Sequence, residues 1–164
     1  MTKVLAGHAA PAFTLRGTRG ETFSLAEALK KGPVVAAFFK VSCPVCQFTF
    51  PFLERLFKAH SGDAVSFVGI SQNDGAETKE FLGEYGITFS GVTDEDGYPV
   101  SNQYGLTTVP TVLLIMPDGR VKVSSVGFCK ADLEKIAKEL GDFLRKKPTC
   151  VFLPSEIVPD YKPG

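Results

Sequence analysis

The sequence has no tryptophan, only two histidines, and no excess of charge of either sign. Its 18 basic residues balance 18 acidic ones, and no basic stripe is visible, which argues against a nucleic-acid partner. Residues 1–12 contain no long apolar run, so we predict neither a signal peptide nor a membrane anchor. The cytoplasm is therefore the default compartment, and export is the alternative if a signal peptide has been removed.

The four cysteines are also too few, and too unevenly spaced, for an obvious metal site. Cys43 and Cys46 form a Cys-Pro-Val-Cys motif, whereas Cys129 and Cys150 are isolated. A structural zinc ion needs four ligands, usually from a second such motif or from paired histidines, and a copper site of the Cys/His type needs a clustered His or Met. Neither is present, so the sequence predicts no metal.

The surroundings of the motif predict redox chemistry instead. A buried strand is expected over residues 33–39 and an amphipathic helix over 47–60, so Cys43 stands at the start of a helix. Free backbone N–H groups and the helix dipole favour negative charge there, and the thiolate is the reactive form of cysteine. Cys46 follows nearly one turn later, close enough to form a disulfide. Two inert core cysteines are the alternative, but these would not need a proline between them.

The remaining pattern predicts a single α/β domain over residues 1–145, with a mixed β-sheet and helices on both faces. Periodicity and capping residues predict strands at 13–15, 21–23, 34–39, 65–70, 88–92, 111–116 and 121–126, and helices at 24–32, 47–60, 74–85, 98–104 and 131–144. The tail, residues 146–164, is interrupted by prolines, so we predict no regular structure in it. Its apolar residues predict that it packs on the domain: Val151, Phe152, Leu153, Ile157 and Val158.

Four motifs in order resemble a known superfamily. They are Ala-Pro-Ala-Phe-Thr-Leu at 10–15, the CxxC followed by Phe50-Pro51, Tyr-Gly-Leu-Thr-Thr-Val-Pro-Thr at 104–111, and Asp-Gly-Arg at 118–120. Together they resemble the redoxin branch of the thioredoxin-like superfamily, which includes peroxiredoxins of the AhpC/TSA type and TlpA-like thiol-disulfide oxidoreductases. The resemblance covers residues 10–144. It implies a thioredoxin-like fold with an N-terminal strand extension and an inserted helix.

The resemblance also implies a substrate site around Cys43. It places a cis peptide bond between Val109 and Pro110 opposite the sulfur, where the Val109 backbone would pair with an extended substrate. An ordinary trans proline at the start of a strand is the alternative. The residues expected to bind substrate are Val109, Pro110, Thr108, Pro44, Val45 and Phe128. Cys129 is a candidate auxiliary thiol on the same rim, although it and Cys150 are also compatible with inert thiols.

The motif departs from its relatives in ways that affect the expected chemistry. Ala37 stands where thioredoxins have a buried Asp, and Thr49 stands where TlpA-like proteins often have a Glu. Without a carboxylate to take its proton, Cys46 is expected to resolve mixed disulfides slowly. The Val45 N–H is expected to bond the Cys43 sulfur, which predicts a reduction potential above the roughly −270 mV typical of thioredoxin.

These observations favour a thiol-disulfide oxidoreductase that exchanges disulfides through Cys43 and Cys46, with no cofactor beyond its redox-active disulfide. Its partners would be protein or small-molecule disulfides and a reductant or oxidant that the sequence does not name; the oligomeric state is likewise open. A thiol peroxidase using Cys43 or Cys46 is the first alternative, but the Pro, Thr and Arg that peroxiredoxins place around their reactive cysteine are not matched. A non-catalytic module that binds a partner near Val109 and Phe128 is the second.

Overall fold

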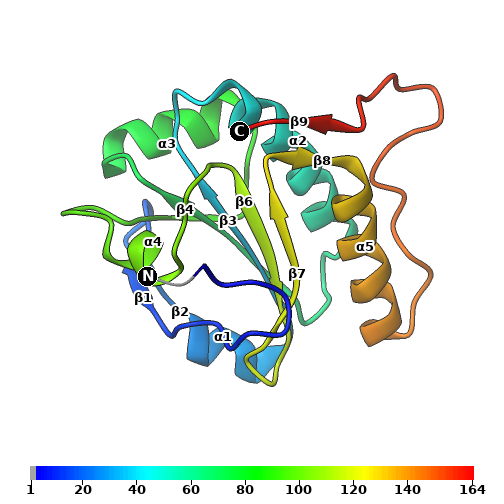
Figure 1. Ribbon diagram of the computed structural model, residues 1–164, viewed down its shortest axis with the longest axis horizontal. Coiled ribbons are helices and arrows are strands. Elements are labelled where there is room, and N and C mark those ends of the chain that lie inside the picture. Colours follow the sequence, from blue (N-terminus) through cyan, green and yellow to red (C-terminus); the bar gives the residue numbers. More distant parts are fainter. Residues whose placement is uncertain (1–2) are drawn as a thin grey trace.

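The computed structural model describes residues 3–164, so residues 1 and 2 of the predicted domain lie outside the described part. Within it, the helices are α1 (Leu25–Lys31), α2 (Pro44–Ala59), α3 (Gly75–Glu84), α4 (Pro99–Gln103) and α5 (Lys130–Leu144). The strands are β1 (Thr14–Arg16), β2 (Thr22–Ser24), β3 (Val34–Phe39), β4 (Ser66–Ser71), β5 (Ser90–Thr93), β6 (Thr111–Ile115), β7 (Val121–Val126), β8 (Phe128–Cys129) and β9 (Tyr161–Lys162). Figure 1 shows their arrangement.

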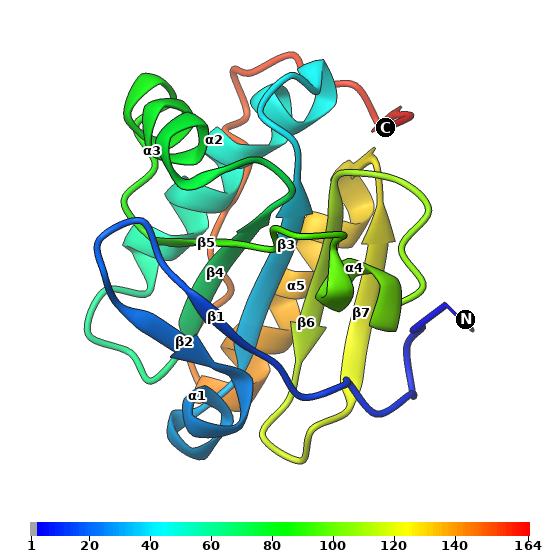
Figure 2. The same ribbon diagram turned by 90° about the vertical axis from the view of Figure 1, so that its left-hand side faces the viewer.

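A mixed sheet forms the centre of the molecule, in the order β5-β4-β3-β6-β7. β3, β4 and β5 run parallel, while β6 is antiparallel to β3 and β7 is antiparallel to β6. In Figure 2, α1, α4 and the β1–β2 hairpin lie in front of the sheet, and α2, α3 and α5 lie behind it. The predicted α/β class, with helices on both faces of a mixed sheet, is confirmed.

β3 is central because it is apolar on both of its faces. All six of its residues are buried, and alternate side chains enter opposite cores, as the two-residue repeat of a strand requires. Val35, Ala37 and Phe39 pack in the core shared with α2, α3 and α5. The other three β3 residues pack with α1, α4 and the hairpin. The CxxC motif follows shortly after the C-terminal end of this strand, so packing in both cores fixes the position of the site.

Local capping accounts for where the helices begin. Ser24 Oγ accepts a hydrogen bond of 3.3 Å from the Glu27 N–H, and Asp74 Oδ1 accepts one of 2.8 Å from the Glu77 N–H. Both helix starts were predicted from these capping residues. The strand predicted at 88–92 instead begins at Ser90. The backbone N–H of Thr88 donates to the Glu54 carboxylate at 2.8 Å, so this residue is held by a side chain before the ladder begins.

The tail contains more structure than its prolines indicate. Tyr161 and Lys162 form β9, which pairs antiparallel with β8, so the prediction of no regular structure is wrong at these two residues. Val151 and Phe152 are buried, and the Phe152 ring lies 4.9 Å from that of Phe52 on α2. Val158 is half-buried, but Leu153 and Ile157 are exposed rather than packed. In Figure 1 the tail rises beside α5 and then crosses toward the start of α2.

No helix among residues 3–164 combines the length and the apolar character that crossing a membrane requires.

Candidate active site

Cys43 is the N-cap residue of α2, and its sulfur accepts the hydrogen bond that begins the helix. Its backbone is extended, with φ −81° and ψ 114°, and Pro44 occupies the first helical position. The Cys46 N–H donates to Cys43 Sγ over 3.2 Å. This corrects the expectation that Val45 is the donor. An N-cap side chain can bond the second or third helical amide, and here the third, that of Cys46, lies nearest the sulfur.

The two cysteines differ in their access to solvent. Cys43 is half-buried, whereas Cys46 is fully buried in the core beneath the helix. Burial raises the pKa of the Cys46 thiol, and its side-chain hydrogen bond with Cys43 raises it further. Cys46 is therefore held as a neutral thiol, and Cys43 is the sulfur that a substrate can reach.

The loop before β6 brings a backbone carbonyl to the same sulfur. The Val109–Pro110 peptide bond is cis, as the resemblance implied. Cys43 Sγ lies 3.6 Å from the Val109 carbonyl oxygen. The Thr111 hydroxyl donates to the Thr108 carbonyl over 2.7 Å, which holds the loop in place before the strand begins. Segments far apart in the sequence therefore meet at Cys43.

The other predicted substrate-binding residues fall into two groups. Pro44 is exposed, Val45, Thr108 and Val109 are half-buried, and Pro110 is buried immediately before β6. Phe128 is fully buried, and its role in substrate binding stays a prediction. Its ring packs 4.9 Å from that of Phe48 and supports α2 from the core side. The sequence pattern alone does not reveal that this side chain faces the core.

The remaining thiols lie outside the pair. Cys129 is half-buried in β8 at the start of α5, and burial raises the pKa of its thiol. Cys150 is exposed in the tail, and its thiol donates to the Phe152 carbonyl over 3.0 Å. All four cysteines are free thiols. The auxiliary role considered for Cys129 stays a prediction.

No buried acid of the described residues is directed at Cys46. Ala37 is enclosed in the core, and the buried Thr49 donates its hydroxyl to the Val45 carbonyl over 2.7 Å. Glu54 binds Thr88, and Asp94 accepts hydrogen bonds from the amides of Val100 and Ser101. The proton of Cys46 therefore has no side-chain carboxylate as its acceptor, as expected from the residues at positions 37 and 49. Nor do three or more His, Cys, Asp or Glu side chains gather as a metal site anywhere in residues 3–164.

Two features of the site have no counterpart in the sequence motifs. The end of the tail lies against the Val109 loop, since a Cβ added at Gly164 would overlap the Val109 carbonyl oxygen. The same loop also borders a cavity of about 300 Å³, which is lined by Lys40, Gln72 and Val109, among others. Neither could be found by periodicity or spacing, because each depends on residues that are distant in the sequence.

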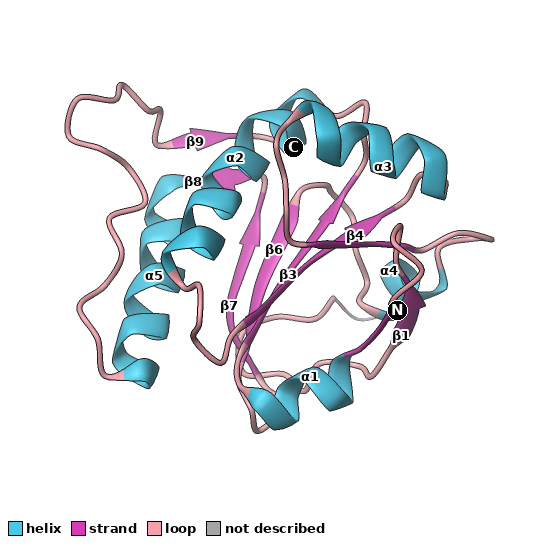
Figure 3. Ribbon diagram, turned by 180° about the vertical axis from the view of Figure 1, so that it is seen from behind, coloured by secondary structure: helices cyan, strands magenta, loops and turns pink. Residues whose placement is uncertain are grey.

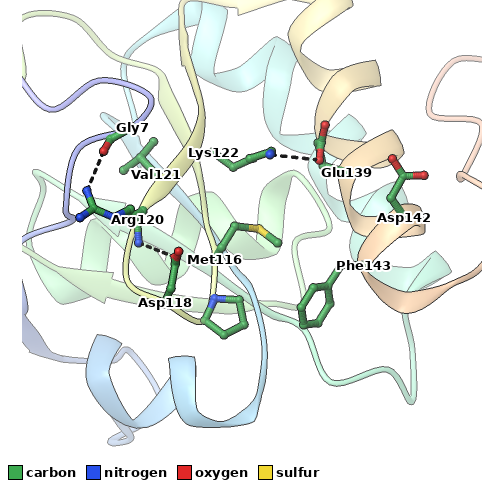
Figure 4. A pocket seen from close by; sticks show the side chains of 10 residues that line it. Gly7, Met116, Asp118, Arg120, Val121, Lys122, Glu139, Asp142 and Phe143 are labelled. Carbon is green, nitrogen blue, oxygen red and sulfur yellow. Dashed lines mark hydrogen bonds and ion pairs between the residues drawn. The ribbon is translucent and has the colours of Figure 1, made fainter.

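A cavity of about 860 Å³ lies away from the cysteines. Figure 4 shows it between the β6–β7 turn and the last turns of α5, with Met116 and Phe143 facing across it. Its rim carries the Lys122–Glu139 ion pair, with 4.0 Å between Nζ and Oε2. Figure 1 shows this turn at the end of the sheet opposite the start of α2, so the cavity takes no part in the site at Cys43.

Comparison with known proteins places this geometry in context. Residues 6–124 match the AhpC/TSA family. The thiol-disulfide oxidoreductase ResA of Halalkalibacterium halodurans is 32% identical over 132 residues, which cover 79% of this chain and 74% of that protein. A secreted disulfide oxidoreductase of Mycobacterium tuberculosis, described as homologous to DsbE of E. coli, has a TM-score of 0.63 at 26% identity, with 76% of this chain and 92% of that chain covered.

The thioredoxin domain of a thiol-disulfide oxidoreductase from Bacteroides vulgatus has a TM-score of 0.73 at 21% identity and covers 84% of this chain and 99% of that chain. At this identity the likeness concerns the fold alone. The thioredoxin-like fold expected from the sequence motifs is confirmed.

Proposed function

Because this chain belongs to the AhpC/TSA family and is a thiol-disulfide oxidoreductase, we propose that Cys43 is its nucleophile and Cys46 its resolving cysteine. One observation carries the assignment: the accessible sulfur of Cys43 accepts the Cys46 N–H at 3.2 Å, while the Cys46 sulfur is fully buried behind it. The amide and the helix dipole both stabilise negative charge on Cys43, which is the charge of the attacking thiolate.

The proposed reaction takes place in two exchanges. The Cys43 thiolate attacks one sulfur of a substrate disulfide, so that a Cys43–substrate bond forms, the substrate disulfide breaks, and one substrate thiolate leaves. Cys46 then loses its proton to solvent, and its thiolate attacks Cys43. The Cys43–Cys46 disulfide forms and the second substrate thiolate is released. The substrate gains two electrons and the protein loses two, which an external thiol reductant must restore. Substrate oxidation follows the same steps in reverse.

The backbone of Val109 supports a role for this loop in substrate binding. Its carbonyl lies 3.6 Å from Cys43 Sγ, so an extended chain that carries a disulfide can pair with Val109 while its sulfur meets Cys43. Protein disulfides and small disulfides are both proposed as substrates, with a thiol or disulfide partner of unidentified chemistry to complete the cycle. The cytoplasmic compartment stays a prediction, and cell fractionation with rapid thiol alkylation would test it.

A redox titration against dithiothreitol or glutathione, with alkylation and mass spectrometry of each cysteine, tests the proposal. We expect one reversible two-electron transition confined to Cys43 and Cys46. The Cys150→Ser variant is the matched control, because that thiol is exposed in the tail and should leave the transition unchanged. If Cys129 or Cys150 cycles in place of the pair, the assignment is wrong.

The peroxidase alternative is not supported by the surroundings of Cys43. Its sulfur contacts the Val109 carbonyl and the Cys46 amide, and within residues 3–164 it makes no hydrogen bond with an arginine. A thiol without a group to orient and polarise peroxide reacts only at ordinary thiol rates. Peroxide consumption by the reduced protein should therefore be slow, and consumption much faster than that of a free thiol would restore this alternative.

A further inference from the structure

The last residues of the tail contact two elements of the site at once. Lys162 pairs with Phe128 of β8 in an antiparallel register. Its ammonium group lies 4.7 Å from the centre of the Phe48 ring on α2, in the geometry of a cation–π contact. Figures 1, 2 and 3 all place the C-terminal end beside the start of α2, where Cys43 lies.

The segment also reaches the loop that faces Cys43. A Cβ at Gly164 would overlap the Val109 carbonyl oxygen and lie 2.6 Å from Thr108 Cγ2, so only glycine permits this approach. That carbonyl is the one that lies 3.6 Å from Cys43 Sγ. On the other side, a Cβ at Gly127 would lie 2.6 Å from the Lys162 carbonyl oxygen and 3.1 Å from the Gly164 nitrogen. The tail backbone is thus fitted closely between the end of β7 and the Val109 loop.

We propose that residues 161–164 are an internal occupant of the track on which an extended protein substrate would bind, and that a protein disulfide gains access to Cys43 only when this segment leaves. The inference rests on the proposed function, in which the Val109 backbone pairs with substrate. Two extended chains cannot fill the same space beside Val109, so tail and substrate compete. A small disulfide does not need this track, and the half-buried Cys43 sulfur remains within its reach.

The preceding part of the tail keeps the segment close to the site. Phe152 packs against Phe52 of α2, and the Arg55 guanidinium binds the Glu156 carboxylate through two hydrogen bonds of 2.7 and 2.9 Å. These anchors hold the end of the chain at high effective concentration near Val109. Residues 161–164 can therefore leave and return without release of the whole tail. That makes the segment a competitor that a protein substrate displaces locally.

A chain truncated after Asp160 tests the proposal. It loses β9 but keeps the Arg55–Glu156 pair and the hydrogen bond from the Lys130 N–H to the Asp160 carbonyl. If the segment is docked about nine-tenths of the time, it lowers the apparent affinity for a competing protein substrate about tenfold. We therefore expect kcat/KM for insulin reduction to rise about tenfold on truncation. With hydroxyethyl disulfide as the small substrate, the rate should change less than about twofold, because the docked segment does not block the access of a small disulfide to Cys43.

The Lys162→Ala variant provides a second test that retains the full chain. It removes the cation from the Phe48 ring and should increase insulin reduction in the same direction, while Lys147→Ala, at an exposed tail position, should not. A synthetic peptide of residues 159–164 should inhibit the truncated chain with insulin as substrate. Circular dichroism of each variant establishes that it is folded.

The outcomes separate the two proposals. If truncated and full chains reduce insulin at equal rates while both reduce the small disulfide, the occupant proposal is wrong and the oxidoreductase mechanism stands. If Lys162→Ala and Lys147→Ala behave alike and the peptide does not inhibit, the occupant proposal is also wrong. If neither chain reduces either disulfide, both proposals fail.

Discussion

The backbone nitrogen of Cys46 lies 3.2 Å from the sulfur of Cys43, so the amide of the second cysteine stabilises the sulfur of the first. The amide of Cys46 and its thiol can be studied separately, because the amide bonds the Cys43 sulfur while the thiol is fully buried in the core. Replacement of the Cys46 side chain therefore leaves the hydrogen bond to Cys43 in place. This relationship determines what single cysteine variants should do.

Cys46→Ser is expected to stop the reaction after the first exchange, at the mixed disulfide. Cys43 keeps its helix position and its amide donor, so it still attacks a disulfide, but no second thiol releases the product. The variant should accumulate a Cys43–substrate mixed disulfide that is visible by mass spectrometry. Cys43→Ser should accumulate none. A mixed disulfide on Cys46 in the Cys43→Ser protein would reverse the two assignments.

The amide of Cys46 also predicts the direction of the redox potential. A hydrogen bond donated to the Cys43 sulfur stabilises the thiolate, and therefore the reduced protein, which makes the disulfide more oxidising. We expect a midpoint above the roughly −270 mV of thioredoxin. Equilibration with dithiothreitol mixtures of known ratio measures it, and a clearly lower midpoint would contradict the argument.

The resolving step should depend strongly on pH. Burial raises the pKa of Cys46, so this thiol is protonated near neutrality and must ionise before it attacks. Below that pKa the thiolate population rises roughly tenfold with each pH unit, and the rate of resolution should follow it. Rapid-mixing measurements on a preformed mixed disulfide between pH 6 and 9 test this. A flat profile would show that a proton acceptor operates at the site.

A carboxylate at position 49 should remove much of that dependence. Thr49 is buried, and its hydroxyl donates a hydrogen bond to the Val45 carbonyl. Thr49→Glu is expected to accelerate resolution at pH 7 by about 10²-fold, which is typical of general base catalysis. Thr49→Gln supplies a side chain of similar size without a base and should not accelerate the step. Equal rates in the two variants would exclude the carboxylate as the cause.

The ion pair that anchors the tail should weaken in acid. The hydrogen bond from Arg55, followed by that from the Leu153 N–H, lowers the pKa of Glu156 from 4.5 to about 2. Since the folded pKa lies below the unfolded one, the carboxylate stabilises the docked tail fully above pH 4.5 and loses this effect as the pH falls toward 2. The difference in melting temperature between the native chain and Glu156→Gln should shrink over that interval. Glu134→Gln, at an exposed position on α5, is the control.

Phe152 should be the main apolar anchor of the tail. Its ring is 8% exposed and packs against Phe52 and Phe128 at 4.9 and 6.0 Å between centroids. Phe152→Ala is expected to lower the free energy of unfolding by about 3 kcal/mol, as for other buried aromatic truncations. Leu153→Ala changes the next residue, which is 48% exposed, and should cost less than about 1 kcal/mol. Urea unfolding of both variants measures the difference, and similar losses would show that the tail is not anchored at Phe152.

The features that were predicted correctly depend on neighbours in the sequence. Helix starts at Ser24 and Asp74 follow from side chains that bond amides three residues later. The β3 strand is recognisable because its residues are continuously apolar. The position of Cys43 before a helix follows from the same local pattern, and the resemblance supplied the cis bond before Pro110.

The features that were missed depend on distant contacts. Thr88 lies outside its predicted strand, and its backbone N–H donates instead to the carboxylate of Glu54 on α2. Phe128 faces the core because Phe48 and Phe52 enclose it. β9 exists because β8 offers an edge on which to pair, and the proline spacing of the tail contains no sign of it.

Backbone capping, apolar periodicity and the spacing of two cysteines act over a few residues, so the amino-acid order alone specifies most of the helices and strands and the proposed redox pair. Packing of the core fixes which sulfur is accessible, which amide donates a hydrogen bond to that sulfur, and which segments lie beside it. Burial of Cys46, the approach of Val109 and the return of the tail to the site each require segments that meet only when the core has packed.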